Sequence, residues 1–174
     1  MYTKEQINGW RLVTDSVHAL GGTIFAQLWH VGRVSHVSIQ EDGKCPVGAS
    51  DKIAKPAWTY AYQSDGTPGK IAASEPRALT TDEVKRVVRD FANAAANAIE
   101  AGFDGVEIHG ANGYLLEQFM NPKVNDRTDE YTGATVDDRL KFPLEVVDAI
   151  IERVGRNRTA IRISPYARFR HASI

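Results

Sequence analysis

The sequence of 174 residues predicts an α/β fold in which strands alternate with helices along the chain. Helical segments carry apolar residues three and four positions apart, while short runs rich in β-branched and aromatic residues stand between them. Capping signals open the helices and glycines close them. Strands separated by helices in this order are expected to be parallel and joined by right-handed crossovers.

The first helix and the first strand are predicted at the N-terminal end. Thr3 and Gln6 stand at the spacing of a capping box, and the helical pattern stops at Gly21-Gly22. The apolar stripe between them consists of Ile7, Trp10, Val13, Val17 and Leu20. Residues 23–28 (TIFAQL) follow as a continuous β-rich run, which is typical of a strand buried on both faces.

A long irregular segment follows, from residue 29 to about 79. Periodicity disappears there, and glycine, proline and serine recur. Because plain connectors are much shorter, we interpret residues 29–79 as a functional excursion loop within a single domain spanning residues 1–174. Trp58, Tyr60 and Tyr62 give this loop side chains to pack and are compatible with a hairpin.

The clearest helix of the sequence begins at a second capping box, Thr80 and Glu83, and ends at Gly102. Its apolar face consists of Val84, Val87, Val88, Phe91, Ala95 and Ile99. Residues 103–109 then predict a strand that ends in polar residues.

A loop rich in glycine, asparagine and aspartate separates that strand from the last helix and strand. Residues 136–154 predict the helix, which Pro143 is expected to bend or restart because proline lacks the amide hydrogen. Residues 159–163 (TAIRI) predict the third strand.

Composition favours a small-molecule ligand over macromolecular partners. The chain is 43% hydrophobic and 25% charged with a formal net charge of -1, so neither nucleic acid nor a membrane surface is an expected partner. No apolar run is long enough to span a bilayer, and the N-terminus is polar. A single cysteine, Cys45, allows no internal disulfide, which fits a reduced cytoplasmic compartment.

Both a barrel and a doubly wound sheet are compatible with this element order, and two observations favour the barrel. The strands carry polar residues near their ends, Gln27, His109 and Arg162, which in a barrel would face one mouth. In addition, no strand is followed by the glycine pattern of a dinucleotide-binding fold.

Four segments carry a resemblance to a known family. They are residues 27–33 (QLWHVGR), 106–119 (VEIHGANGYLLEQF), 125–131 (NDRTDEY) and 161–165 (IRISP). In these segments, and over essentially the whole chain, the sequence resembles the Old Yellow Enzyme family, including its N-ethylmaleimide reductase and 12-oxophytodienoate reductase branches. The resemblance implies a TIM-type (β/α)₈ barrel, of which this chain covers about strands three to five with their helices.

The resemblance also implies an activity, that of an ene-reductase. Such an enzyme uses FMN, with NADH or NADPH as reductant, to reduce activated C=C bonds of enones or maleimides, or nitro compounds. It implies that His109 and Asn112 hold the substrate oxygen, where negative charge develops during hydride transfer. It further implies that Tyr114 gives a proton to the α-carbon.

The same resemblance assigns cofactor and substrate contacts. Gln27 and Arg162 match residues that contact the flavin ring, since an amide can pair with its pyrimidine edge and a cation favours the anionic reduced form. Trp29 matches an aromatic residue that shapes the substrate pocket. His30 and His36 have no neighbouring carboxylates or thiols in the sequence, so no metal site is expected.

A complete barrel of this type usually needs about 250 residues, and its cofactor phosphate is held by loops after strands seven and eight. A partial barrel exposes strand edges, so self-association or pairing with a complementary barrel fragment is expected. The alternative hypothesis is therefore a non-catalytic remnant that associates in this way and binds no flavin. The tail, residues 167–174, is also unlike the usual continuation of the family.

Overall fold

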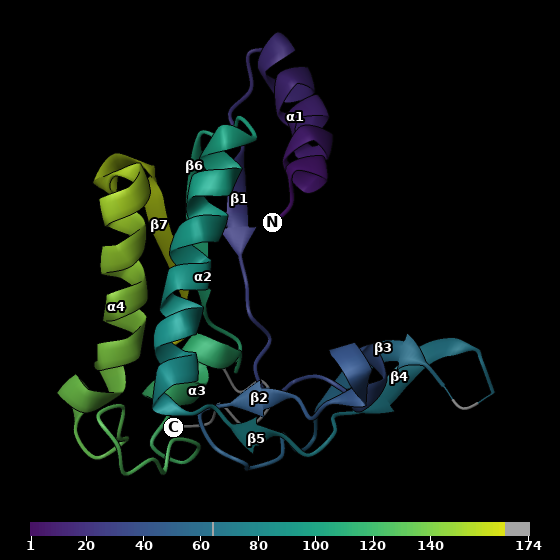
Figure 1. The fold of residues 1–174 in the computed structure, drawn as a ribbon, viewed down its shortest axis with the longest axis vertical. Helices are drawn as coiled ribbons and strands as arrows, with labels where there is room; N and C mark the ends of the chain where they lie inside the picture. Colours follow the sequence, from purple (N-terminus) through teal and green to yellow (C-terminus); the bar gives the residue numbers. More distant parts are fainter. Residues whose placement is uncertain (64, 166–174) are drawn as a thin grey trace. The chain divides into compact units, whose positions relative to one another are not determined.

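The computed structural model describes residues 1–63 and 65–165, so the atypical tail lies outside the described residues. Its main sheet has the strand order β1-β6-β7 (Figure 1). The strands of this sheet are β1 (Phe25–Leu28), β6 (Gly105–Gly110) and β7 (Thr159–Ile163). The helices are α1 (Lys4–Ala19), α2 (Thr81–Glu100), α3 (Leu115–Met120) and α4 (Val136–Val154). Short 3₁₀ turns are η1 (Val37–Ile39), η2 (Glu41–Gly43) and η3 (Arg156–Arg158).

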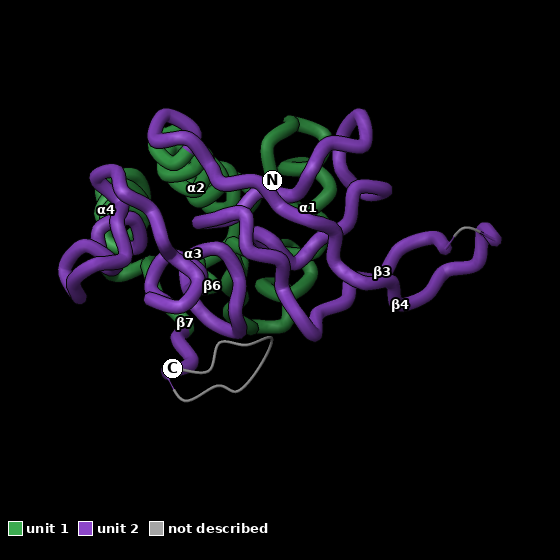
Figure 2. The backbone as a smooth tube through the Cα atoms, turned by 90° about the horizontal axis from the view of Figure 1, so that it is seen from below, with its two compact units in different colours: residues 1–29, 84–109, 144–162 green, residues 30–83, 110–143, 163–174 purple. Residues whose placement is uncertain are grey.

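The chain divides into two units, shown in green and purple in Figure 2. Unit 1 consists of residues 1–29, 84–109 and 144–162, and it contains nearly all of the main sheet. Unit 2 consists of residues 30–83, 110–143 and the residues from 163 on, and it contains the long segment and the turn after β6.

The core of unit 1 lies between the sheet and the two long helices. β1 pairs in parallel with β6, as predicted, and α2 and α4 lie side by side over the sheet (Figure 1). Val106 and Ile108 of β6 are completely buried. The buried residues that α2 and α4 contribute to unit 1 are Val84, Val87, Phe91, Ala92, Ala95, Ala98, Val146 and Ile150. This is the alternation of strand and helix that the sequence predicts, although three strands leave the barrel open.

The predicted boundaries agree closely with the observed elements of unit 1. The third predicted strand, 159–163, coincides with β7, and the predicted helix 136–154 coincides with α4. Pro143 lies inside α4, which is one helix and does not restart there. Pro143 cannot donate a main-chain hydrogen bond, which weakens the helix locally. The burial of Phe142 and Val146 on either side stabilises the same part of α4.

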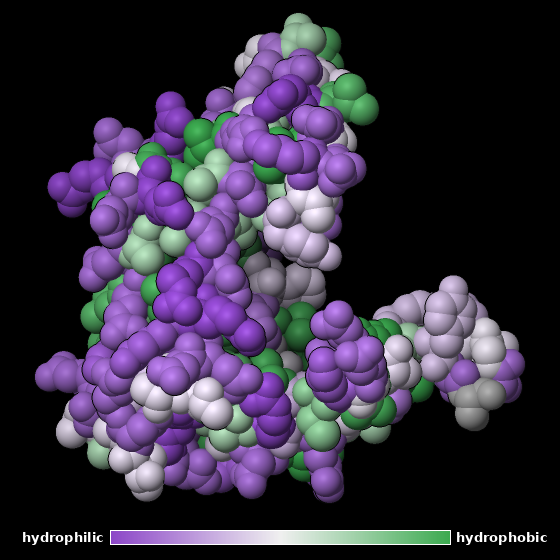
Figure 3. Space-filling view, viewed as in Figure 1, coloured by the Kyte–Doolittle hydropathy of each residue, from purple (hydrophilic) through white to green (hydrophobic). Residues whose placement is uncertain are grey.

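The packing of α1 differs from the predicted apolar stripe. The capping box of Thr3 and Gln6 is present, and Ile7 is buried as expected. Trp10, however, is 46% exposed and Leu20 is 90% exposed. Figure 3 shows green, hydrophobic residues at the surface in the region of α1. The other buried residue of α1 is Thr14, whose hydroxyl donates a hydrogen bond of 2.7 Å to the carbonyl oxygen of Ala101. A polar anchor to the end of α2 therefore fixes this helix.

The first strand is also more open than the sequence suggests. Leu28 is buried, but Phe25 is 45% exposed and Gln27 is exposed. On β7, Ile161 and Ile163 are 44% and 60% exposed. The prediction of two-sided burial for residues 23–28 is therefore wrong for the described part of the chain, where no second layer covers Phe25 and Gln27.

Unit 2 is built largely from irregular chain. Strands β3 (Trp58–Tyr62) and β4 (Pro68–Ala72) form an antiparallel hairpin in the long segment. Strand β2 (Val47–Gly48) pairs in parallel with β5 (Arg77–Ala78). A second cluster packs the rings of Phe119, Tyr131 and Phe142, with the Phe119 and Phe142 centroids 4.5 Å apart. Within the described residues, no helix combines the length and the apolar character that crossing a membrane requires.

Candidate functional site

The sheet of unit 1 presents polar side chains on one of its faces. Gln27 of β1 lies opposite Glu107 of β6, and the Gln27 Nε2 donates a hydrogen bond of 2.5 Å to the Glu107 Oε1. Because side chains alternate along a strand, His109 lies on the same face as Glu107, two residues further along β6. The structure thus brings the predicted residues Gln27 and His109 to one face.

Trp29 follows β1 and lies against His109. Their rings are stacked, with centroids 5.9 Å apart and planes inclined by 27°. His109 is only 6% exposed, whereas Trp29 is 53% exposed. The indole therefore covers the imidazole and keeps one of its own faces open, so Trp29 and His109 form one aromatic surface.

Arg162 is exposed on β7, the strand that neighbours β6 in the sheet. It therefore lies on the opposite side of β6 from Gln27 of β1. An amide and a guanidinium on the two strands that flank β6 are suitable contacts for an extended, polar ring system with acceptor oxygens.

In unit 2, the turn after β6 carries Asn112 in the left-handed region, with φ +57°. Its backbone N–H donates a hydrogen bond of 2.8 Å to the Ser164 Oγ, which in turn donates one of 2.9 Å to the Glu117 Oε2. The N–H of Gly113 donates a second hydrogen bond of 2.9 Å to that same carboxylate oxygen. Asparagine tolerates this backbone conformation better than most residues.

Tyr114 follows this turn and precedes α3 as its N-cap residue. It is half-buried and packs against a small apolar cluster that comes from the long segment. The cluster consists of Val34, Ala54, Ala57 and Ala73. The long segment therefore helps to place the ring of the residue that the sequence predicts as a proton donor.

The buried Gln118 joins the same turn to the segment after Trp29. Its Nε2 donates to the carbonyl oxygens of Gly113 at 2.8 Å and Val31 at 3.3 Å, and its Oε1 accepts from the backbone N–H of Arg33 at 3.2 Å. Gln118 is 1% exposed, so these hydrogen bonds replace water. No sequence pattern indicates a role for Gln118 or Glu117, apart from their polar character in the otherwise apolar α3.

Residues 125–131, which match the family, brace unit 2. Arg127 donates hydrogen bonds to the carbonyl oxygens of Ala49 and Leu79 and forms an ion pair with Asp129. Burial raises the pKa of Asp129, but hydrogen bonds from Arg127, Thr81 and the Tyr131 backbone outweigh it and hold that pKa at about 2. These contacts agree with a structural role for the segment.

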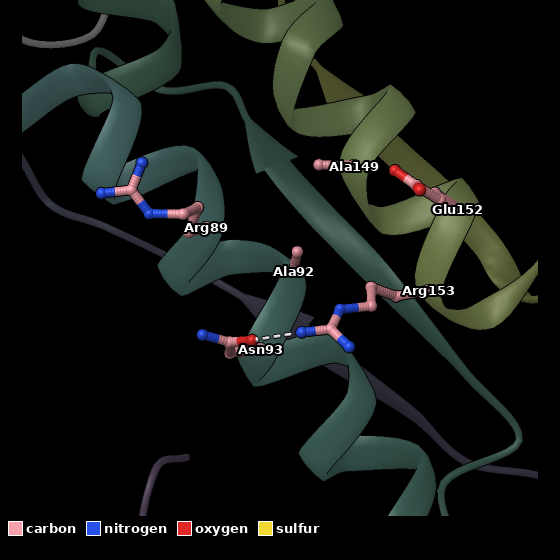
Figure 4. A pocket seen from close by; sticks show the side chains of 6 residues that line it. All are labelled: Arg89, Ala92, Asn93, Ala149, Glu152 and Arg153. Atoms are coloured by element: carbon pink, nitrogen blue, oxygen red, sulfur yellow. Dashed lines mark hydrogen bonds between the residues drawn. The ribbon is translucent and has the colours of Figure 1, made fainter. Parts of the chain in front are cut away.

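A surface groove of about 570 Å³ lies between α2 and α4 in unit 1 (Figure 4). Ala92 and Ala149 form its floor, and the Arg153 Nη2 donates a hydrogen bond of 2.8 Å to the Asn93 Oδ1 at one end. No residue predicted for the active site lines this groove. In the part of the chain that the structure describes, no group of three or more histidine, cysteine, aspartate or glutamate residues could hold a metal ion.

The fold and the polar strand face place the chain among the α/β proteins in which strands of one sheet alternate with helices along the sequence. The sequence profile of the NADH:flavin oxidoreductase / NADH oxidase family matches residues 1–174. The chain therefore belongs to this family, the Old Yellow Enzyme family, as its sequence motifs predict.

Curated relatives agree with this membership. The chain is 47% identical over 169 residues to 12-oxophytodienoate reductase 1 of Oryza sativa subsp. japonica, covering 97% of this chain and 42% of that protein. It is also 47% identical to the putative 12-oxophytodienoate reductase-like protein 1 of Arabidopsis thaliana, covering 96% of this chain and 48% of that protein. The chain thus spans less than half the length of these relatives.

Solved structures show the same relationship. Morphinone reductase in complex with tetrahydroNAD superimposes with a TM-score of 0.93 and 47% identity, over 97% of this chain and 46% of that chain. The old yellow enzyme homologue from Zymomonas mobilis gives a TM-score of 0.90 and 38% identity, over 99% and 46% of the two chains. The open sheet of unit 1 therefore corresponds to part of a barrel.

Proposed function

We propose that this chain forms the chemical centre of an FMN-dependent oxidoreductase that uses NADH or NADPH to reduce electrophilic alkenes, or nitro compounds. The observation that carries the proposal is the family motif of His109, Asn112 and Tyr114, combined with the placement of Gln27 and His109 on one sheet face. Family membership supplies the class of reaction.

Gln27 and Arg162 are suited to the flavin ring. Glu107 accepts one N–H of the Gln27 amide, which leaves the second N–H and the amide oxygen to pair with a pyrimidine edge. The exposed guanidinium of Arg162 would favour negative charge on the bound ring. When bound, FMN supplies the hydride, which it has received from NADH or NADPH.

His109 and Asn112 are proposed to hold the carbonyl or nitro oxygen of the substrate. Arrival of hydride at the β-carbon moves negative charge onto that oxygen, and a donor in place beforehand stabilises the charge without reorganisation. Loss of one such donor typically costs about 2.7 to 4 kcal/mol of transition-state stabilisation. The burial of His109 beneath Trp29 strengthens its hydrogen bond by excluding water.

Tyr114 is proposed as the source of the proton that completes the reduction at the α-carbon. A phenol is protonated at neutral pH and can act as a general acid. Packing of its ring against the cluster around Val34 restricts its position. The histidine and the tyrosine would thus act on opposite ends of one conjugated substrate.

The test uses a complete barrel in which residues 1–165 replace the matching part of morphinone reductase. The Tyr114→Phe form should still oxidise NADH or NADPH with a quinone as acceptor, but should reduce 2-cyclohexenone at least tenfold more slowly than the unsubstituted barrel. Unchanged enone turnover would remove Tyr114 from this role. Failure of the unsubstituted barrel to bind FMN would contradict the proposed function itself.

A second candidate function rests on the exposed apolar residues of unit 1. Trp10, Phe25 and Ile161 are 46%, 45% and 44% exposed, which favours a chain that associates with itself or with a complementary barrel fragment and binds no flavin. Absorbance at about 450 nm after incubation with FMN and gel filtration separates the two candidates. A yellow protein with stoichiometric FMN supports the enzyme, whereas a colourless oligomer supports the remnant.

A further inference from the structure

We propose that Glu117 is a positioning residue that, together with Ser164, holds Asn112 in the conformation needed to bind the substrate oxygen. This inference rests on the proposed function, because it assigns Asn112 a substrate-binding role. Neither Glu117 nor Ser164 is among the residues that the sequence predicted for the site, and they come from different segments, α3 and the residue after β7.

One carboxylate oxygen of Glu117 collects the hydrogen bonds of the turn. Its Oε2 accepts from the N–H of Gly113 and from the hydroxyl of Ser164, each at 2.9 Å. Because the Ser164 hydroxyl donates its hydrogen to Glu117, the Ser164 Oγ is oriented to accept a hydrogen bond of 2.8 Å from the backbone N–H of Asn112. The backbone N–H of Gly113 is thus bonded directly to the Glu117 carboxylate, and the backbone N–H of Asn112 is linked to it through the Ser164 hydroxyl.

The conformation of the turn explains why such a tie is needed. Asn112 has φ +57°, which is unfavourable for a residue with a side chain and must be stabilised by its surroundings. The other end of the Gly113 residue is held as well, because its carbonyl oxygen accepts from the Gln118 Nε2 at 2.8 Å. Adjacent side chains of α3 therefore hold both polar backbone groups of Gly113.

The arrangement leaves the side chain of Asn112 available. Its backbone N–H is used by Ser164, and within the described residues its side-chain amide makes no hydrogen bond. Asn112 is half-buried, so this amide is partly shielded from water. An anchored backbone with an available amide is the combination that a preorganised donor requires.

The carboxylate is the essential feature of Glu117, and Glu117→Gln tests it. A glutamine has a similar shape, but its amide oxygen carries no charge, so it accepts the hydrogen bonds of Gly113 and Ser164 more weakly than the carboxylate oxygen does. Ser164→Ala removes the link to Asn112 from the other side. Glu41→Gln, at an exposed position in η2, is the matched control for the same chemical change.

The first measurement uses the 174-residue chain and needs no activity. Amide hydrogen exchange followed by NMR should show the Asn112 and Gly113 amides exchanging about tenfold faster or more in Glu117→Gln, since hydrogen bonds to a charged group are among the stronger ones. The exchange rates of β6 amides such as that of Ile108 should be unchanged in Glu117→Gln. In Glu41→Gln, the exchange rates of Asn112, Gly113 and Ile108 should all be unchanged. Equal exchange of Asn112 in both variants would overturn the proposal.

The second measurement uses the complete barrel described above and separates positioning from general destabilisation. Glu117→Gln should lower kcat for 2-cyclohexenone about tenfold, and adding it to Asn112→Ala should lower kcat no further, because Glu117 acts through Asn112. Fully multiplicative losses in the double variant would also overturn the proposal. If the unsubstituted barrel reduces no enone, the proposed function fails, and the exchange measurement still decides whether Glu117 fixes the turn.

Discussion

The indole of Trp29 stacks on the imidazole of His109, with ring centroids 5.9 Å apart and planes inclined by 27°. Trp29 follows β1 and His109 lies near the end of β6, so the pairing of two neighbouring parallel strands sets this contact. The stack restricts the ring orientation of a buried histidine, so Trp29 supports His109 in addition to the substrate-shaping role proposed for it.

Substitution of Trp29 should therefore change the environment of His109. In Trp29→Ala the ring protons of His109 should move downfield in the NMR spectrum of the chain as the ring current is lost, whereas Trp29→Phe should keep part of the effect. An aromatic pair contributes about 0.5 to 1.5 kcal/mol beyond its burial, so enone KM in the complete barrel should rise about 2- to 10-fold.

Trp58→Ala is the control, because Trp58 has a similar exposure of 51% and lies on the hairpin. Identical His109 spectra in all forms would contradict the role of the stack.

Gly32 should tolerate alanine much less well than Gly43. Both have positive φ, +59° and +63°, so an added side chain costs each about 1 kcal/mol of backbone strain. A Cβ on Gly32 would lie 2.3 Å from the Gln118 Oε1, and Gln118 is buried and bonded to the backbone, whereas a Cβ on Gly43 meets nothing within 4 Å.

We therefore expect Gly32→Ala to lower the free energy of unfolding by about 2 to 4 kcal/mol and Gly43→Ala by about 1 kcal/mol. Urea unfolding followed by circular dichroism measures both. Equal losses in the two variants would show that Gln118 moves aside without cost, and that it does not hold the segment at Val31 and Arg33.

The secondary structure of unit 1 could be predicted because its signals are local. The helix α4 and the strand β7 have the predicted bounds, and α2 begins directly after the predicted cap Thr80. Which apolar residues are buried was less predictable. Periodicity marks Trp10 and Leu20 as core, yet Thr14 is the residue of α1 that anchors it, because burial depends on which neighbours are present.

The support of the candidate site could not be predicted in the same way. The helix α3 has six residues, fewer than two turns, which is too short for apolar periodicity to indicate a helix. Glu117 and Gln118 act on backbone groups of the turn and of the segment near Val31, and such hydrogen bonds leave no regular spacing in the sequence. The family motif predicts roles for Asn112 and Tyr114, but it does not indicate which contacts hold these two residues in place.

Acid should destabilise unit 2 through two carboxylates. Hydrogen bonds from the Arg77 side chain and from the Thr80 backbone lower the pKa of Glu83 from 4.5 to about 2. For Asp129, burial raises the pKa, but the hydrogen bonds from Arg127 and others outweigh it, and the pKa falls from 3.8 to about 2. A pKa lowered by folding means that the unfolded chain takes up protons first, so stability is complete above about pH 5 and is lost as the pH falls towards 2.

Each of these carboxylates should contribute about 1 to 2 kcal/mol at neutral pH. The urea midpoint of the chain should accordingly fall between pH 5 and pH 2.5, and fall less steeply in the double variant Glu83→Gln, Asp129→Asn. Asp148→Asn, at an exposed position of α4, is the control and should keep the full pH dependence. A double variant as acid-sensitive as the unsubstituted chain would exclude these two groups as the cause.

The anchor of α1 should depend on the Thr14 hydroxyl more than on its methyl group. Thr14 is completely buried, and Thr14→Val keeps the shape but leaves the carbonyl oxygen of Ala101 without this donor, which costs about 1 to 3 kcal/mol. Thr14→Ser keeps the donor and loses only a methyl group, at a cost of about 1 kcal/mol. Ser16→Ala removes a hydroxyl that donates to the Leu12 carbonyl oxygen on the exposed side of α1, and it should change stability by less than about 0.5 kcal/mol. Urea unfolding should therefore show the largest loss of stability for Thr14→Val, a smaller loss for Thr14→Ser and the smallest for Ser16→Ala. A valine variant as stable as the serine variant would mean that α1 is held by apolar contact, as the sequence pattern alone suggests.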